Sequence, residues 1–163
     1  RRAECAQVGP LANRPRRHAV NEFTEDAGKP GATVMSGGEG IGSEGNFWQP
    51  TILSDVPLDA KVFNDEPFGP MAAIRGFDQL EDAIAEANRL PYGLAAYAWT
   101  NSAKTANAIA SQVETGMITI NHLGLAIPEV PFGGVKDSGS GSEGGSEAIE
   151  PSLNPQSVAQ AGR

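Results

Sequence analysis

Cysteine is nearly absent from this sequence: the 163 residues include one, Cys5. A single thiol cannot form a disulfide within the chain or supply a multi-cysteine metal site, so we expect no metal centre and a reducing compartment. The sequence also lacks an apolar run near the roughly 18 residues that a membrane span needs, and no secretory signal opens it. These absences predict a cytoplasmic protein that does not bind a membrane.

Positive charge is also scarce, with 12 Lys and Arg against 20 Asp and Glu and a formal net charge of -8. Without a basic stripe the chain cannot neutralise a phosphate backbone or dock on an anionic bilayer, which argues against nucleic acid and membrane partners. Half of the positive residues lie near the beginning of the chain, and we interpret the group at residues 14–17 as a solvated helix face.

Turn-forming residues are abundant, with 20 Gly and 12 Pro, while hydrophobic residues make up 39%. This composition is typical of a globular protein with many loops. The length fits about one domain of the usual 100 to 200 residues.

Apolar periodicity predicts a helix over residues 11–28, with Ala19, Val20, Phe23 and Ala27 on its buried stripe and Gly28 as its C-cap. Short strands are expected at residues 32–35 and 51–56, separated by a Gly-rich loop.

The segment from Pro70 to Asn121 alternates apolar runs with helical patterns. Asp78 and Glu81 have the spacing of a capping box, and Ser102 is expected to begin a second helix that ends before Gly116. Apolar runs precede, separate and follow these helices, at residues 71–74, 94–99 and 117–120. This order predicts an α/β fold in which the three runs are strands of one parallel sheet.

Two segments match Gly-x-Gly-x-x-Gly, at Gly40, Gly42 and Gly45 and at Gly139, Gly141 and Gly144. A dinucleotide fingerprint needs this string between a buried strand and a helix. Neither string has that context, so both are interpreted as turns.

Glu66 and Phe68 lie in a corner stiffened by Pro67, Gly69 and Pro70. A carboxylate suits a pair of vicinal ribose hydroxyls, and a flat apolar ring suits the side of a nicotinamide. The alternative is a surface glutamate beside a core phenylalanine.

Two further candidates have structural alternatives. Phe132 lies in a Gly-rich loop that could simply place the ring in a core, and His122 follows a predicted strand, where a lone histidine is more often a hydrogen-bonded structural residue. His18 is expected in solvent. Cys5 has no feature that would activate its thiol, so we do not interpret it as a nucleophile.

Several motifs together resemble the C-terminal part of the NAD(P)-dependent aldehyde dehydrogenase superfamily. They are GNFWQPT, NDEPFGP, ANRLPYGLAAYAWT, TGMITIN and PFGGVKDSGSG, in order and spacing, and the likeness extends from about Gln7 to about Ile149. PEVPFGGVKDSG and SEGGSEAIE are most similar to the succinate-semialdehyde-dehydrogenase-like group.

The resemblance implies a three-layer α/β sandwich with a mostly parallel sheet. Residues 1–137 would be part of the catalytic domain, and residues 138–163 a Gly-rich return loop and oligomerisation tail. The implied activity is oxidation of an aldehyde, including a semialdehyde, to an acid with NAD or NADP, in a homo-oligomer. The choice between NAD and NADP and the identity of the aldehyde stay open.

The resemblance also assigns roles to residues. Glu66 would bind the nicotinamide ribose and Phe68 would flank the nicotinamide. Phe132 would line the aldehyde tunnel, whose mouth would be shaped by the loop from His122 to Val130. Glu143 would relay protons from the deacylating water, and residues 153–158 would form a strand across a dimer interface.

Departures from the family pattern limit what the chain is expected to do. The nucleophilic cysteine, general-base glutamate, oxyanion asparagine and Rossmann domain are expected upstream of Arg1, so the 163 residues should be inactive alone. Ser140 and Pro151-Ser152 replace expected aromatics. The alternatives are a non-catalytic assembly or regulatory module derived from the same fold, and a truncated product without function.

Overall fold

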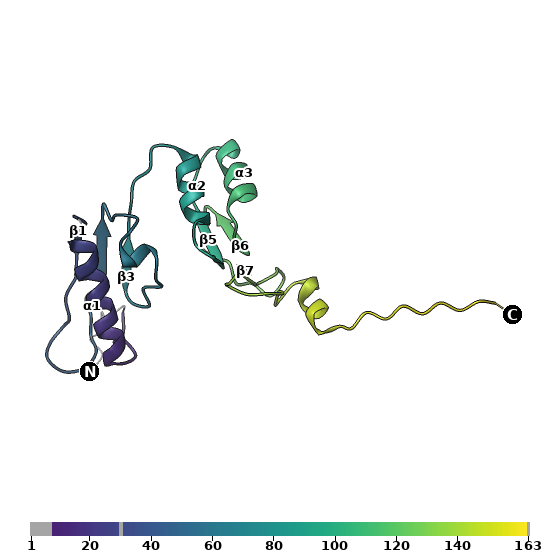
Figure 1. The fold of residues 1–163 in the computed structure, drawn as a ribbon, viewed down its shortest axis with the longest axis horizontal. Helices are drawn as coiled ribbons and strands as arrows, with labels where there is room; N and C mark the ends of the chain where they lie inside the picture. Colours follow the sequence, from purple (N-terminus) through teal and green to yellow (C-terminus); the bar gives the residue numbers. More distant parts are fainter. Residues whose placement is uncertain (1–7, 30, 163) are drawn as a thin grey trace. The chain divides into compact units, whose positions relative to one another are not determined.

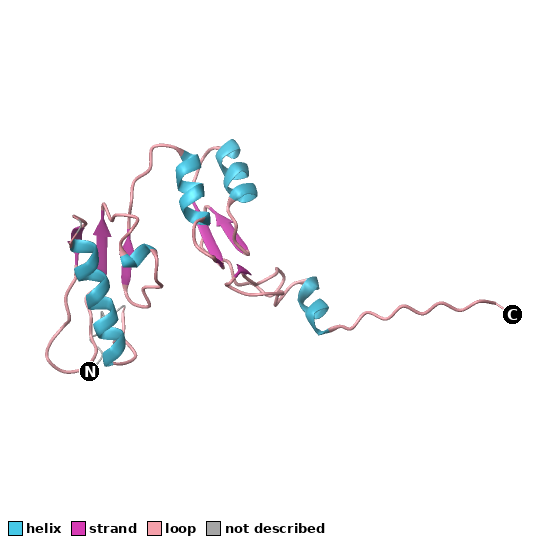
Figure 2. Ribbon diagram, in the orientation of Figure 1, coloured by secondary structure: helices cyan, strands magenta, loops and turns pink. Residues whose placement is uncertain are grey.

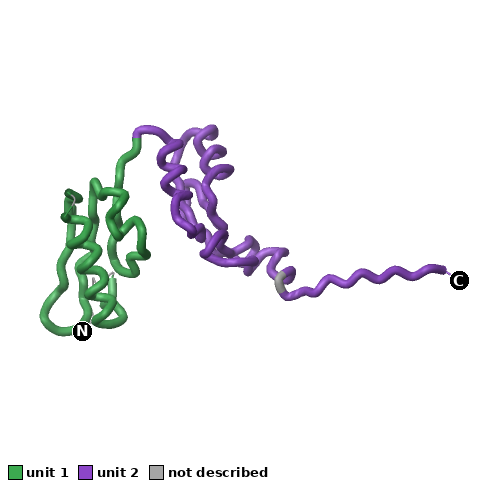
Figure 3. Tube along the Cα trace, in the orientation of Figure 1, with its two compact units in different colours: residues 1–77 green, residues 78–163 purple. Residues whose placement is uncertain are grey.

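A computed structural model describes residues 8–29 and 31–162 of the chain (Figure 1). Helices and short strands alternate along it, and loops connect them (Figure 2). The chain divides into two compact units, Arg1–Phe77 and Asp78–Arg163 (Figure 3). The residue that the sequence analysis excluded as a nucleophile, Cys5, lies outside the described residues.

The first unit contains a helix and a three-stranded sheet of order β1-β2-β3. β1 (Thr33–Ser36) is antiparallel to β2 (Thr51–Ser54), which is parallel to β3 (Met71–Ala73). The helix is α1 (Arg14–Gly28), and a short 3-10 turn, η1 (Lys61–Phe63), precedes β3.

The core of this unit lies between α1 and β2. Phe23 and Ala27 of the helix pack with Leu53 of β2, and Val56, Ala60 and Val62 complete the cluster. β2 alternates buried and exposed residues, as expected for a strand with one face on a core. The predicted helical stripe is therefore confirmed.

The N-cap residue Asn13 determines where α1 begins. The Asn13 side chain accepts a hydrogen bond from the Arg16 amide at 2.9 Å, and Pro15 lies in the first turn, where its missing N–H costs nothing. The helix therefore begins at Arg14, later than predicted.

The second unit contains two small sheets and two helices. β5 (Ala95–Ala98) is parallel to β6 (Met117–Ile120), and α3 (Ala103–Gln112) connects them. β4 (Tyr92–Gly93) is antiparallel to β7 (Val135–Lys136). The remaining elements are α2 (Leu80–Asn88) and the 3-10 helix η2 (Ser146–Ser152).

Two predictions for this region are confirmed. The Ser102 side chain caps α3 by accepting from the Thr105 amide at 3.2 Å. Both Gly-x-Gly-x-x-Gly strings lie in loops, where Gly42, Gly45, Gly139, Gly141 and Gly144 have positive φ. Neither string opens a helix.

One prediction is wrong. α2 begins at Leu80 after Gln79 and has no side-chain cap, because Asp78 lies one residue too early to be the N-cap. Of the three apolar runs, the last two pair in parallel as β5 and β6, whereas the first, β3, pairs with β2 within its own unit. Periodicity identifies a strand but carries no information about its partner.

The helices within the described residues are all too short or too polar to cross a membrane. After η2 the chain has no helix or strand through residue 162, and Leu153 and Val158 are 57% and 81% exposed. The predicted strand at residues 153–158 does not form in this single chain.

Candidate functional site

The sequence-predicted site residues are divided between the two units. Glu66 and Phe68 belong to the first unit, whereas His122, Phe132 and Glu143 belong to the second. Each group is described within its own unit.

The corner that carries Glu66 and Phe68 is fixed by backbone hydrogen bonds. The Phe68 amide donates to the Glu66 carbonyl at 3.0 Å, and the Thr51 amide of β2 donates to the Pro70 carbonyl at 2.8 Å. Gly69 approaches α1 so closely that an added Cβ would lie 2.5 Å from a methyl group of Val20. Glycine at this position is therefore required for the contact between the corner and the helix.

Both candidate side chains of the corner face solvent. Glu66 is exposed, and Phe68 keeps 62% of its surface accessible. The structure therefore does not support the alternative of a core phenylalanine. The Arg16 guanidinium carbon lies over the Phe68 ring, 5.3 Å from its centroid, which is a cation–π contact.

Sequence reasoning missed Arg16. It lies far from Phe68 along the chain, and the contact exists because Gly69 brings the corner against α1. No signal in the sequence pairs the two residues.

In the second unit, Phe132 and Glu143 form an antiparallel bridge. The Phe132 amide donates to the Glu143 carbonyl at 2.6 Å, and the Glu143 amide donates to the Phe132 carbonyl at 2.7 Å. Residues directly opposite each other in such a pair project their side chains to the same face. The ring and the carboxylate therefore share one side of the bridge.

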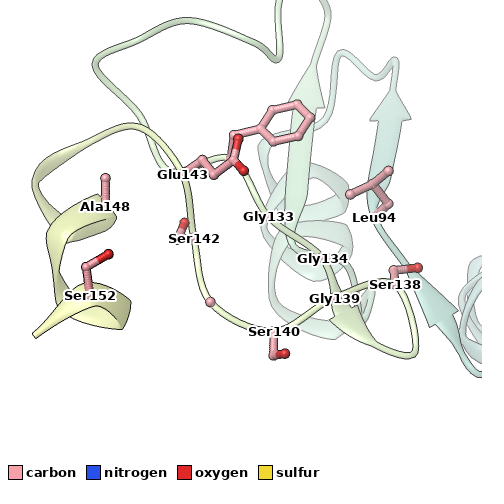
Figure 4. A pocket seen from close by; sticks show the side chains of 12 residues that line it. Leu94, Gly133, Gly134, Ser138, Gly139, Ser140, Ser142, Glu143, Ala148 and Ser152 are labelled. Carbon is pink, nitrogen blue, oxygen red and sulfur yellow. The ribbon is translucent and has the colours of Figure 1, made fainter.

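An open cleft of about 390 Å³ lies beside this bridge (Figure 4). Leu94 borders one side, and Ala148 and Ser152 of η2 border the other. Phe132 and Glu143 both line the cleft, together with Gly133, Gly134, Ser138, Gly139, Ser140, Gly141 and Ser142.

The glycines of this loop allow its backbone segments to touch. A Cβ on Gly133 would lie 2.6 Å from the Gly141 carbonyl oxygen, and one on Gly134 would lie 2.7 Å from the Ser138 carbonyl oxygen. The Ser138 hydroxyl in turn accepts from the Gly93 amide at 2.9 Å. Any larger side chain at Gly133 or Gly134 would displace the wall of the cleft.

His122 does not line this cleft. Its Nδ1 accepts from the Gly124 amide at 3.2 Å, and its carbonyl accepts from the Thr119 hydroxyl at 2.7 Å. Its ring is therefore part of a local turn at the end of β6. The loop that follows exposes Leu123 and Ile127.

One electrostatic shift lies outside both groups. A hydrogen bond from Arg89 to Glu86 raises the pKa of Arg89, at the C-terminal end of α2. Among the described residues, no three histidines or acids come together in a way that could hold a metal ion.

Comparison with known proteins defines the class to which these features belong. The aldehyde dehydrogenase family matches residues 1–158. The chain therefore belongs to the aldehyde dehydrogenase family, and the resemblance found in its motifs is confirmed.

Individual relatives are similar over most of this chain but over a small part of their own length. The chain is 46% identical over 148 residues to the 4-(hydroxymethyl)benzenesulfonate dehydrogenase of Comamonas testosteroni. These aligned residues make up 91% of this chain and 31% of the relative. It is 40% identical over 159 residues to the mitochondrial succinate-semialdehyde dehydrogenase of Rattus norvegicus, and the alignment covers 98% of this chain and 30% of that relative. The chain thus spans about a third of the length of these curated relatives.

Solved structures give the same result. The succinate-semialdehyde dehydrogenase of Burkholderia pseudomallei matches with a TM-score of 0.85 and 36% identity, over 91% of this chain and 31% of that one. The NAD+ complex of a Bacillus cereus aldehyde dehydrogenase matches with a TM-score of 0.81 and 38% identity, over 89% of this chain and 30% of that one. The α/β class is therefore confirmed.

Proposed function

We propose that this chain is the C-terminal part of the catalytic domain of an NAD(P)-dependent aldehyde dehydrogenase that oxidises an aldehyde of the semialdehyde class. In the complete reaction, aldehyde, water and oxidised cofactor give a carboxylic acid, reduced cofactor and a proton. The succinate-semialdehyde dehydrogenases among the relatives support the substrate class. The motif order within residues 7–149 supports the C-terminal placement.

The observation that carries this proposal is the bridge between Phe132 and Glu143. The sequence resemblance gives these residues two different roles at one site, and their mutual hydrogen bonds put both on the wall of one cleft. In the proposed site the Phe132 ring contacts the apolar part of the aldehyde. The Glu143 carboxylate is open to solvent and accepts protons released during hydrolysis.

The corner at Glu66 and Phe68 fits the nicotinamide end of the cofactor. The exposed carboxylate can accept hydrogen bonds from two ribose hydroxyls, and the face of the Phe68 ring opposite Arg16 offers a flat apolar surface. When bound, NAD or NADP supplies the acceptor for the hydride that leaves the substrate. Glu66 and Phe68 orient that group and take no part in bond making.

We propose that the 163 residues alone do not catalyse the reaction. The covalent step needs a thiolate, and Cys5 lacks the Gly-Gln lead-in of the family nucleophile and is too near Glu66 in sequence. In the complete protein, residues 1–137 would contribute to a three-layer sandwich with a mostly parallel sheet, and residues 138–163 would form the return loop and oligomerisation tail. His122 and the loop after it would shape the substrate entrance.

A matched pair of phenylalanines tests the cofactor assignment. Phe68 and Phe77 are both 62% exposed and both lie in the first unit. In the full-length enzyme, Phe68→Ala should raise the KM for the nicotinamide cofactor about tenfold, because a lost ring contact is worth about 1 to 1.5 kcal/mol. Phe77→Ala should leave it unchanged. Equal KM values for the two variants would contradict the assignment.

The catalytic claim has a separate test. The purified 163-residue chain, given succinate semialdehyde and either cofactor, should form no reduced cofactor above the buffer rate, measured by its absorbance. The full-length protein should turn over, and Phe132→Ala in it should raise the KM for the aldehyde. Turnover by the isolated chain would refute the need for a nucleophile elsewhere.

A further inference from the structure

A second cleft, of about 450 Å³, lies in the first unit between α1 and the loop that joins β1 to β2. The helix contributes Arg14, Arg17, His18 and Asn21, which recur at the spacing of one helical face. The loop contributes Gly40, Ser43, Gly45 and Trp48.

Arg17 gives this cleft a fixed shape. Its guanidinium donates to the Gly45 carbonyl at 3.1 Å and to the Gly42 carbonyl at 3.3 Å, which ties the loop to the helix. Gly40 passes so close that an added Cβ would overlap the Arg17 guanidinium. Residues 14–17 are exposed or partly exposed, as the predicted solvated face requires, and within that face the side chain of Arg17 is bonded to the loop. Its two bonds leave three of the five guanidinium N–H donors for a ligand.

The base of the loop is also fixed. Gly40 and Trp48 form an antiparallel bridge, and the Ile41 amide donates to the Phe47 carbonyl at 3.0 Å. Trp48 is 5% exposed, and its indole N–H donates to the Thr51 hydroxyl at 3.1 Å. The cleft therefore has a rigid wall opposite the helix.

The side chains that line the cleft carry positive and no negative charge. Within the described part of the chain, neither Arg14 nor Arg17 takes part in an ion pair. The side-chain amide of Asn21, one of the lining residues, donates to the Glu25 carboxylate at 2.7 Å. On a chain of net charge -8, this is a local concentration of cations facing an open volume.

We propose that this cleft binds a small phosphate ester, with the phosphoryl group between Arg14 and Arg17 and the organic part over the loop. Two guanidinium groups match the charge and the several oxygens of a phosphoryl dianion better than the single charge of a carboxylate. The volume exceeds what the phosphoryl group alone would fill, which leaves room for an organic part. This site is separate from the residues assigned to catalysis and does not depend on the proposed activity.

Isothermal titration calorimetry of the full-length protein with phenyl phosphate tests the site. Arg14→Gln should weaken binding about tenfold, because it removes one of the two guanidinium groups that hold the phosphoryl group while Arg14 itself is exposed. Arg14 is preferred to Arg17 because, among the described residues, its side chain makes no hydrogen bond or ion pair, whereas the Arg17 side chain bonds to the loop. Lys104→Gln, which removes one exposed positive charge from the second unit, should bind like the wild type.

Four results would overturn the proposal. The first is no binding of phenyl phosphate up to about 10 mM, and the second is an equal loss of affinity in Lys104→Gln, which would indicate general charge attraction. The third is benzoate binding as tightly as phenyl phosphate. The fourth is loss of phenyl phosphate binding in the presence of saturating NAD, which would assign the ligand to the cofactor site.

Discussion

Gly116 lies immediately before β6, against the backbone of the cleft loop. A Cβ there would overlap the Gly133 carbonyl oxygen and would come 2.9 Å from the Gly134 Cα. Both neighbours are backbone atoms, so they cannot rotate away. Gly116→Ala should therefore lower the free energy of unfolding by about 1 to 3 kcal/mol, measured by urea denaturation.

Gly76 provides the matched control for Gly116. A Cβ at Gly76 would have no heavy atom within 4 Å. Gly76→Ala should change the free energy of unfolding by no more than about 1 kcal/mol, and the expected direction is a small stabilisation. Equal destabilisation by the two substitutions would show that the crowding at Gly116 has no energetic effect.

Leu53 and Ile52 are neighbours on β2 that face opposite sides. Leu53 is 0% exposed and belongs to the core, whereas Ile52 is 41% exposed. Leu53→Ala should cost about 2 to 5 kcal/mol, because it leaves a cavity as well as removing buried surface. Ile52→Ala should cost less than half as much. Thermal unfolding of the two variants checks this, and similar losses would contradict the assignment of the buried face.

At the scale of elements, the two helices of the second unit differ in how they begin. Ser102 caps α3 with its hydroxyl, whereas Gln79 supplies no side-chain cap to α2. Ser102→Ala should lower the free energy of unfolding by about 1 kcal/mol, because it removes the capping bond. Gln79→Ser should raise the free energy of unfolding by at least about 0.5 kcal/mol, because it adds one. Both changes are measurable by chemical denaturation.

Asn101 provides the control for the Ser102 cap. It precedes Ser102, is exposed and lies outside α3. Asn101→Ala should leave the stability nearly unchanged. If it were as destabilising as Ser102→Ala, the cost would come from the loop rather than from the capping bond.

Sequence reasoning succeeded for elements whose signals are local. α1 and β6 follow from apolar spacing, α3 follows from its spacing and its Ser102 cap, and β6 has the predicted bounds. The predicted C-cap of α1 is wrong, because Gly28 is the last residue of the helix and Lys29 is its C-cap. Sequence reasoning did not identify the partner of β3, which pairs with β2. Strand pairing depends on contacts between distant residues, which periodicity does not encode.

The candidate site divides in the same way. Pro67, Gly69 and Pro70 made the corner at Glu66 and Phe68 predictable from adjacent residues. The bridge between Phe132 and Glu143 and the position of Arg16 over Phe68 were not predictable from spacing. Both depend on how loops fold back on other parts of their unit.

At the scale of the whole molecule, the end of the chain adds little to the stability of a single copy. Leu153 and Val158 are largely exposed, and residues 153–162 have no helix or strand. Deleting residues 154–163 should leave the melting temperature of the 163-residue chain within about 1 °C, measured by circular dichroism, because little apolar surface is uncovered. A larger drop would mean that the tail packs on the chain.

The same deletion should act differently in the full-length protein if the tail pairs with another copy. Exposed backbone with two aliphatic side chains can add as a strand to a partner. Size-exclusion chromatography should then show a smaller assembly for the truncated enzyme. An unchanged elution volume would contradict the proposed oligomerisation tail.

The amino-acid sequence by itself determined the three α-helices, the longer strands β1, β2, β3, β5 and β6, the stiff corner at Glu66 and the family to which the chain belongs. These depend on neighbouring residues, or on motifs preserved in order. Only the tertiary structure decided which strands pair, that Phe132 and Glu143 share a cleft wall, and that Arg17 ties a loop to α1 to form a basic cleft. Each of these depends on contacts between residues far apart in the chain, which form because burial and hydrogen bonding bring the segments together on folding.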